Sequence, residues 1–326
     1  MTRLHQILIG LLVIQLILVG LVFFLPKPGQ AAATPLLGAT KAEDITALTI
    51  RDDKGTSIKL AKGAAGWTLP EAGDFAADSA KITPVTVKLA ALKAGRSVAQ
   101  NAASFKRLQV ADDAFQRKVE IGTAGGGAFT LYLGSSAGGR ATHVRLAGQN
   151  DVTIASDLAP FDVNADAASW INASYLEVTQ ADVTSLTLKN AQGQFLFEKN
   201  AQGQWTMQGL AADEQFSANN FTTVLTYAGS LRMTRPLGKS DQPSYGMAQP
   251  SAVVTLKTKK DNQEKTITLT IGAQDAADNT YIVKSSESPY YVKVNDYSVN
   301  ELVTRGKTNF LQQPTPMPGV TPAPKP

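Results

Sequence analysis

The sequence predicts an α+β fold of two tandem repeats, each with mainly antiparallel strands and one main helix, behind an N-terminal transmembrane helix. Three observations support it. The segment "DVTSLTLKNAQG" (182–193) repeats "DITALTIRDDKG" (44–55), strand and helix spacings follow in the same order in both copies, and an uncharged apolar run lies near the N-terminus. The predicted divisions are a transmembrane anchor and linker at 1–33, repeats at 34–176 and 177–312, and a disordered Pro-rich tail at 313–326.

The N-terminal run from Ile7 to Leu25 contains no charged residue. At about 1.5 Å per helical residue its length approaches the ~30 Å of a bilayer's hydrocarbon layer, and a helix tolerates its Gln15. A cleaved signal peptide is the alternative, because small residues lie at Ala31 to Ala33. The run is longer than the roughly 7–15 apolar residues of a signal peptide, which favours a retained anchor in contact with the lipid bilayer.

The orientation of this anchor rests on the layout of the chain. Arg3 and Lys27 flank the run and nearly balance. Six residues precede the run and the rest of the chain follows it, as in a signal-anchor whose C-terminal bulk is exported. We therefore expect a single-pass protein with an extracytoplasmic body, and the zero cysteine count is compatible with that location.

Each repeat opens with strand signals. The residues of "ITALTI" (45–50) alternate between two faces, and the second copy repeats the alternation from Val183 to Leu188. Each copy continues with a turn, a short strand and another turn, and then reaches a tryptophan. Trp67 and Trp205 lie 138 positions apart, which is also the offset between Asp44 and Asp182, so the register holds without a gap.

A helical spacing follows in each copy. The apolar residues on one helix face are Ile82, Val85, Leu89 and Leu92 in the first copy, and Phe221, Val224, Ala228 and Leu231 in the second. Pro84 is expected in the first turn of its helix, where its missing N–H costs little. A meander of about four strands and a short helix close each copy, with Gly134 and Gly272 ending matched strands "AFTLYLG" and "TITLTIG".

Composition disfavours a nucleic-acid partner. Hydrophobic residues make up 43% of the 326-residue chain, enough for one or two cores, and the net charge is only +4. The most basic stretch, "KTKKDNQEK" from Lys257 to Lys265, also contains acids and amides. It indicates a solvated hairpin tip rather than a phosphate-binding patch.

Catalytic patterns are present but incomplete. "GSSAG" (134–138) matches the G-x-S-x-G pattern around a nucleophilic serine, here Ser136. That chemistry needs a strand, a sharp turn and a helix, with an acid and a histidine downstream. The segment lies between two strand signals, and the only downstream histidine is His143. We therefore predict a turn and no enzyme, and keep a serine hydrolase as an alternative function.

Ligand-binding patterns are equally weak. "GTAGGG" (122–127) lacks the Lys-Ser/Thr ending of a phosphate-binding loop and indicates a flexible turn. The acids of "QDAADN" (274–279) could supply calcium ligands but miss the spacing of a twelve-residue loop. Trp67 and Trp205 are expected in the core, and a cell-wall glycan module that stacks sugars on them is a second alternative. No catalytic, cofactor or metal residue is assigned, and the ligand-binding residues are unknown.

The C-terminal tail from Pro314 onward has a proline at nearly every second position. Proline lacks an N–H donor and fixes φ, so helix and sheet are excluded. A solvated tail is expected, with a proline-rich ligand for a partner groove as the alternative.

The second copy also carries a series of family motifs. It contains "SYGMAQPSAVVTLK" (244–257), then "LTIG", "TYIVK" and "YYVKV", and an early "W-x-L" followed by a helix is present as in "GWTLPEAG" (66–73). This series resembles the bacterial DUF4340 family. The likeness covers most of Asp44 to Gln312 and is strongest in the second copy, because "SFKRLQVADDAF" in the first departs from it.

This resemblance implies a protein at the bacterial inner membrane with a periplasmic body. It also implies an accessory role in an envelope or ABC-transport-type system, and defines no catalytic residue. We expect a membrane-anchored binding or scaffold protein with an envelope or membrane protein as partner.

Overall fold

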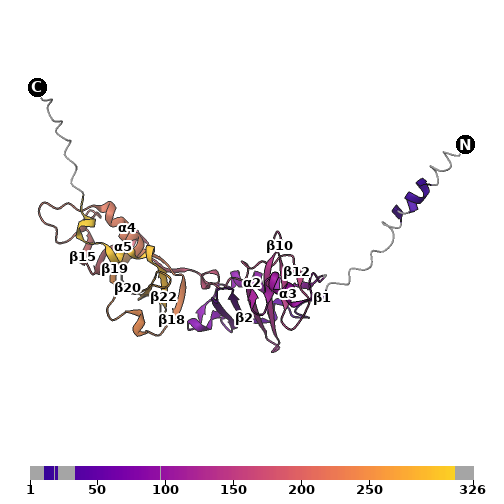
Figure 1. The fold of residues 1–326 in the computed structure, drawn as a ribbon. Helices are drawn as coiled ribbons and strands as arrows, with labels where there is room; N and C mark the ends of the chain where they lie inside the picture. Colours follow the sequence, from indigo (N-terminus) through magenta and orange to yellow (C-terminus); the bar gives the residue numbers. More distant parts are fainter. Residues whose placement is uncertain (1–10, 18, 21–33, 96, 313–326) are drawn as a thin grey trace, which may run out of the picture.

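The computed structural model describes residues 11–17, 19–20, 34–95 and 97–312. Its main feature is a pair of eight-stranded antiparallel sheets, each in its own lobe (Figure 1). The first sheet has the order β12-β11-β10-β9-β2-β3-β4-β5 and the second has the order β16-β15-β14-β19-β20-β21-β22-β18. Seven strands lie in the same order in both sheets: β4-β3-β2-β9-β10-β11-β12 in the first corresponds to β16-β15-β14-β19-β20-β21-β22 in the second. They differ in the extra edge strand, β5 in the first and β18 in the second.

The strands of the first sheet are β2 (Ile45–Asp52), β3 (Ser57–Gly63), β4 (Gly66–Leu69), β5 (Phe75–Ala76), β9 (Arg117–Thr123), β10 (Ala128–Gly138), β11 (Ala141–Leu146) and β12 (Thr153–Ala155). Those of the second are β14 (Val183–Asn190), β15 (Gly193–Lys199), β16 (Trp205–Met207), β18 (Arg235–Gly238), β19 (Ala252–Lys260), β20 (Gln263–Asp275), β21 (Thr280–Ser285) and β22 (Tyr291–Asn295). Three two-stranded sheets join β1 (Thr34–Pro35) to β6 (Lys93–Ala94), β13 (Ser174–Glu177) to β17 (Ser230–Arg232), and β7 (Val110–Ala111) to β8 (Ala114–Phe115).

The helices are few and short. Within residues 34–95 and 97–312 the α-helices are α2 (Ser79–Ala90), α3 (Ala102–Arg107), α4 (Ala218–Gly229) and α5 (Asn300–Thr304). Asp78 caps α2 by accepting the Ala80 N–H at 3.0 Å, and Ser217 caps α4. Pro84 lies inside α2 rather than in its first turn, which corrects the sequence-based expectation.

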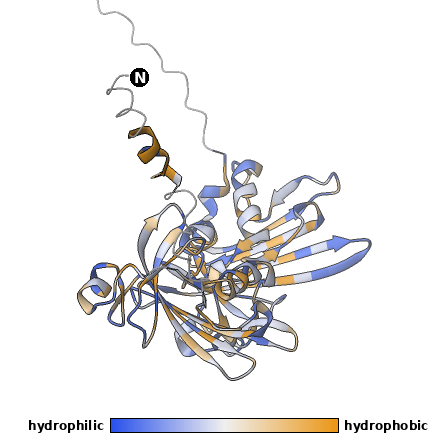
Figure 2. Cartoon of the chain, turned by 90° about the vertical axis from the view of Figure 1, so that its right-hand side faces the viewer, coloured by the Kyte–Doolittle hydropathy of each residue, from blue (hydrophilic) through white to orange (hydrophobic). Residues whose placement is uncertain are grey.

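The predicted α+β class is wrong, because the protein is mostly antiparallel β-sheet. The predicted N-terminal transmembrane helix is also not supported. Most of the run from Ile7 to Leu25 lies outside the described residues. The described part of the run, 11–17 and 19–20, is helical and mostly apolar (Figure 2). Among the helices that the structure describes, none has both the length and the apolar character needed to cross a bilayer. The predicted tail at 313–326 likewise lies outside the described residues.

Alternation along the strands builds the core. Leu48 and Ile50 of β2 are fully buried, as are Leu186 and Leu188 of β14, and a threonine stands between the two members of each pair. The apolar faces of α2 and α4 pack in the same continuous cluster of buried residues. Burial of these faces is the main source of stability for helices this short.

The lobes meet around one tyrosine. The ring of Tyr290, from the second lobe, packs edge-on against Phe75 with centroids 4.8 Å apart. Its hydroxyl donates to the carbonyl oxygens of Gly73 at 3.4 Å and Asp74 at 3.3 Å. The backbones of Gly73 and Gly238 approach so closely that a Cβ on Gly73 would lie 3.5 Å from the Gly238 Cα. β18 therefore lies on the side of the second lobe that faces the first (Figure 1).

Candidate functional site

A groove of about 360 Å³ lies between the C-terminal half of α2 and the edge strand β12. Its volume falls in the range typical of ligand sites. Its lining residues are Val87, Lys88, Ala91, Leu92 and Lys93 on one side, and Ile154, Ala155, Ser156, Asp157 and Leu158 on the other. We call this feature the α2–β12 groove.

Two exposed apolar side chains line this groove, and two more lie on neighbouring segments. Val87 is 50% exposed and Ile154 is 37% exposed, and both line it. Val98, 47% exposed, lies beside β12 because its N–H donates to the Val152 carbonyl oxygen. Phe161, 63% exposed, stands on the loop that follows the groove lining. Within residues 34–95 and 97–312, the only other exposed large hydrophobic side chain is Tyr297. Such clustering is typical of interaction sites.

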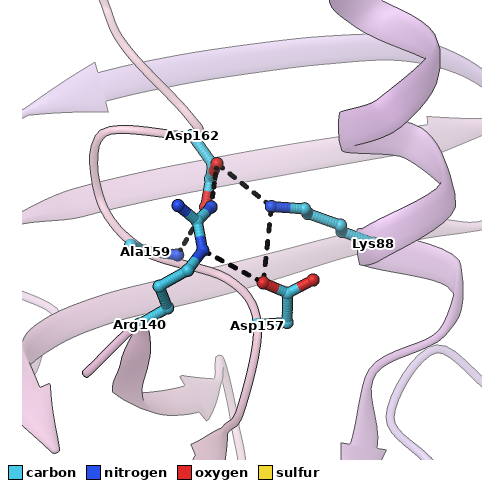
Figure 3. Close-up of polar contacts among 5 residues, drawn as sticks. All are labelled: Lys88, Arg140, Asp157, Ala159 and Asp162. Carbon is cyan, nitrogen blue, oxygen red and sulfur yellow. Dashed lines mark hydrogen bonds and ion pairs between the residues drawn. The ribbon is translucent and has the colours of Figure 1, made fainter. Parts of the chain in front are cut away.

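A charged cluster borders the groove, because two of its members, Lys88 and Asp157, line it. Figure 3 shows Lys88 reaching from α2 toward Asp157 and Asp162, which also hold Arg140. The Lys88 amine lies 3.1 Å from an Asp162 oxygen, and an Arg140 Nη2 lies 2.9 and 3.1 Å from the two oxygens of that carboxylate. The Ala159 N–H donates to the same carboxylate at 2.9 Å. The cluster therefore fixes the loop that carries Leu158 and Phe161.

Asp162 is the centre of this cluster. Burial alone would raise the pKa of the Asp162 carboxyl, but the Ala159 N–H and the Lys88 amine outweigh it, so the pKa is lowered. The hydrogen bond to Asp157, together with the charge of Asp162, raises the pKa of Arg140. Both shifts favour the charged forms of Asp162 and Arg140, so these two groups form a stable ion pair at neutral pH.

The matched surface of the second lobe is different. The 139-position offset of the helix residues matches Val87 to Thr226, and the strands "DVTIAS" and "YYVKVN" match Ile154 to Lys293. Thr226 is exposed, and the Lys293 amine lies 2.7 Å from carboxylate oxygens of both Asp275 and Asp278. The two exposed apolar positions of the groove are therefore polar in its counterpart.

The hydrolase alternative finds no support in the geometry around Ser136. Ser136 is exposed on β10, and its Oγ accepts the Gly138 N–H at 3.2 Å. His143 lies beside Ser135 instead, with its Nδ1 2.9 Å from the Ser135 carbonyl oxygen and 3.2 Å from the Oγ. A carbonyl only accepts, so Nδ1 carries the hydrogen and cannot take the serine proton. No described carboxylate hydrogen-bonds to His143.

The two matched tryptophans pack against other side chains of their lobes. Trp67 is buried, and Trp205 is half-buried with its ring 4.7 Å from that of Phe221. The Lys199 amine lies 5.3 Å from the Trp205 ring centre. Trp67 therefore lies in the core as predicted, whereas Trp205 packs against the core and stays partly exposed.

The remaining motifs have structural roles. The stretch from Lys257 to Lys265 forms the β19–β20 hairpin, whose turn residues Asp261 and Asn262 have φ of 51° and 61°. Gly122 to Gly127 form the tight β9–β10 turn. The acids of 274–279 bind Lys293, as described above. Within the described part of the chain, no cluster of three or more His, Cys, Asp or Glu could hold a metal ion.

Sequence reasoning missed the α2–β12 groove, because its two sides lie more than sixty positions apart in the chain. A signal was available, however. Val87 stands on the polar side of α2, whose buried residues are Ile82, Val85, Thr86 and Leu89, and the matched helix has a threonine there.

The described residues form a two-lobed antiparallel β protein with a partly apolar groove on its first lobe. A family model described as a domain of unknown function (DUF4340) matches residues 67–235, more than half of the 326-residue chain. The chain belongs to this family. The match ends at Arg235, before the motif series that starts at 244–257 and suggested the resemblance. The description of the family gives neither a cellular location nor an activity. No curated protein and no solved structure matches the chain.

Proposed function

We propose that this protein is a non-enzymatic binding or scaffold component of a bacterial envelope system, of the accessory or ABC-transport-associated kind, and that the α2–β12 groove takes its partner. The observation that carries the proposal is the exposure of Val87 and Ile154 in this groove and the polar residues, Thr226 and Lys293, at their matched positions in the second lobe. A partner protein that covers Val87 and Ile154 would remove this apolar surface from water.

The charged cluster supports the same proposal. Interfaces commonly combine an apolar centre with a polar rim, and the cluster of Lys88, Arg140, Asp157 and Asp162 borders the apolar lining. Because these charges are mutually satisfied, they hold the rim in place without repelling a partner. The rigid rim lowers the entropy lost on binding.

The test exchanges the groove residues for those of the second lobe. Full-length protein with Val87→Thr and Ile154→Lys is expressed in its native cells, crosslinked and purified, and co-purifying envelope proteins are quantified. Loss of about 1–2 kcal/mol of apolar contact predicts a fall in partner recovery of roughly tenfold. The matched control, Thr226→Val, should leave recovery unchanged. Equal recovery with the double variant and the control, at equal thermal stability, would refute the proposal.

We also propose that the body of the chain works on the extracytoplasmic side of the bacterial inner membrane, where an envelope partner would meet it. The zero cysteine count is compatible with this location. A C-terminal β-lactamase fusion should protect cells against ampicillin. A stable fusion that gives no resistance would contradict the location and leave the groove proposal standing.

A further inference from the structure

The covalent link between the two lobes is short. Trp170 and Ile171 are buried in the first lobe, where the Trp170 carbonyl oxygen accepts a backbone N–H at 2.7 Å. The Ala173 carbonyl oxygen accepts the Met233 N–H of the second lobe at 2.8 Å. Exposed Asn172 lies between these two anchored parts of the chain. A rotation of one lobe against the other can therefore be absorbed by the backbone angles at Asn172.

The interface beside this link is incompletely packed. The 3₁₀ helices η2 (Pro70–Ala72) and η3 (Ala167–Ser169) of the first lobe contact β18 of the second. A cavity of about 90 Å³ is lined by residues of both lobes, among them the charged Lys59, Glu71 and Arg235. Relative motion of domains is the expected behaviour unless the interface between them is large and apolar. This interface alone therefore does not account for a fixed angle between the lobes.

Tyr290 is the aromatic side chain that crosses from one lobe to the other. Its ring packs edge-on against Phe75, and its hydroxyl donates to the carbonyl oxygens of Gly73 and Asp74. Lys239, which belongs to the second lobe, places its amine 5.0 Å from the centre of the ring. The side chain thus combines an aromatic contact and hydrogen bonds in one connection between the lobes.

The loop that receives the Tyr290 hydroxyl has an uncommon backbone. Gly73 and Asp74 have φ of 67° and 60°, which places both in the left-handed region. Glycine adopts this region readily, but it is uncommon for a residue with a side chain such as Asp74. Such a conformation persists where surrounding contacts hold it, and it is often part of a switch. Here the hydrogen bond to the Asp74 carbonyl oxygen comes from the other lobe.

The loop that carries Tyr290 is itself held in place. The Tyr175 hydroxyl of β13 donates to the Tyr290 carbonyl oxygen at 2.7 Å and accepts the Ser285 N–H at 2.8 Å. The strands "DVTIAS" and "YYVKVN" match Tyr290 to Asp151 of the first lobe. The tyrosine is therefore a feature of the second copy alone, which fits a role between the lobes rather than within each one.

We propose that Tyr290 is a latch that fixes the angle between the lobes, and that the lobes open about Asn172 when this latch is released. In the closed arrangement the Tyr290 ring lies against Phe75 and its hydroxyl bonds to the loop at Gly73 and Asp74. In the open arrangement water replaces these hydrogen bonds, and Asp74 leaves its left-handed conformation. The latch lies outside the α2–β12 groove, so this proposal goes beyond the proposed function.

A distance measurement between two spin labels tests the latch. The chain has no cysteine, so Gly125→Cys and Lys259→Cys place one label on each lobe without competing thiols. Both positions are exposed, one in the β9–β10 turn and the other on β19. We expect the labelled full chain to give one narrow distance distribution in double electron–electron resonance.

Four variants separate the parts of the latch. Tyr290→Phe keeps the ring and removes the hydroxyl, and it should raise the open fraction by roughly fivefold. Tyr290→Ala also removes the aromatic contact and should raise the open fraction by more than about tenfold, seen as a broader distribution. Asp74→Gly suits the left-handed backbone and keeps the carbonyl oxygen, so the lobes should stay closed. Tyr297→Ala is the matched control, because Tyr297 belongs to the same lobe and is 65% exposed.

Thermal unfolding of each variant shows whether the lobes themselves remain folded. If Tyr290→Ala does not fold, the comparison of Tyr290→Phe with the natural chain decides the question. The latch is wrong if the folded Tyr290 variants keep the narrow distribution of the natural chain. It is also wrong if Tyr297→Ala broadens the distribution as much, or if the natural chain already gives a broad one. Recovery of a partner through the α2–β12 groove is measured separately, so failure of the latch leaves the proposed function standing.

Discussion

Replacement of Gly134 with alanine tests how closely the backbone at Leu108 and Gln109 packs on strand β10 of the first sheet. A Cβ built on Gly134 would lie 2.0 Å from the Leu108 carbonyl oxygen and 2.6 Å from that of Gln109, closer than real contacts allow. The Leu108 oxygen would have to move by about 1 Å, which breaks its 2.9 Å bond from the Ser135 N–H. Overpacking of about 1–3 kcal/mol plus about 1 kcal/mol for the lost bond gives a destabilisation of about 2–4 kcal/mol.

Thermal unfolding of the full chain measures this effect. The loss corresponds to a fall in Tm of roughly 5–15 °C. Gly125→Ala is the matched control, because a Cβ there meets nothing within 4 Å and should shift Tm by less than about 2 °C. Gly272→Ala should behave like Gly134→Ala, since its Cβ would lie 2.0 Å from the Tyr245 carbonyl oxygen. If Gly134→Ala and Gly125→Ala unfold at the same temperature, the backbone at Leu108 and Gln109 moves aside at no cost and the reasoning fails.

Three further predictions follow. Asp162→Asn should destabilise the protein by about 2–3 kcal/mol at pH 7 in urea unfolding. Because folding lowers the pKa of Asp162, its contribution is present above the unfolded value of about 3.9 and is lost as the pH falls through the folded value. The difference from the natural protein should therefore shrink below about pH 4, and a constant difference would contradict the assignment. Phe221→Ala should cost about 3–5 kcal/mol by the same assay, because its buried ring contacts those of Phe197 and Trp205, and a loss under about 1 kcal/mol would contradict that packing. A fluorophosphonate probe should label neither the natural protein nor Ser136→Ala, and labelling of the former alone would restore the hydrolase alternative.

Strand positions could be predicted from the sequence because the side chains of a half-buried strand point alternately to the core and to solvent, so apolar and polar residues alternate. The alternation at Ile45–Asp52 and Val183–Asn190 gives β2 and β14. The matched glycines at 134 and 272 were visible as the ends of strands, but the reason for them is a distant carbonyl group, which no local pattern reveals. The predicted domain boundary at 176 and 177 stays a prediction, and it falls within β13, which pairs with β17 of the second lobe.

The fold class was wrong because one clear helix per copy received too much weight. The helical spacings are real, since α2 and α4 occupy them, but each has 12 residues beside an eight-stranded sheet. The α2–β12 groove could not be predicted, because it depends on which strand ends at the edge of the sheet. Only the contrast between Val87 and Thr226 pointed to it in the sequence.

Site-specific photo-crosslinking in native cells tests the central claim most directly. A benzophenone side chain is placed at Val87 of the α2–β12 groove or at Thr226, its exposed counterpart on α4. The account predicts a defined crosslink to one envelope protein from position 87 and none from position 226. Equal crosslinking from both positions, or none from position 87 while the protein is folded and at its normal level, would contradict the claim that this groove is the binding surface.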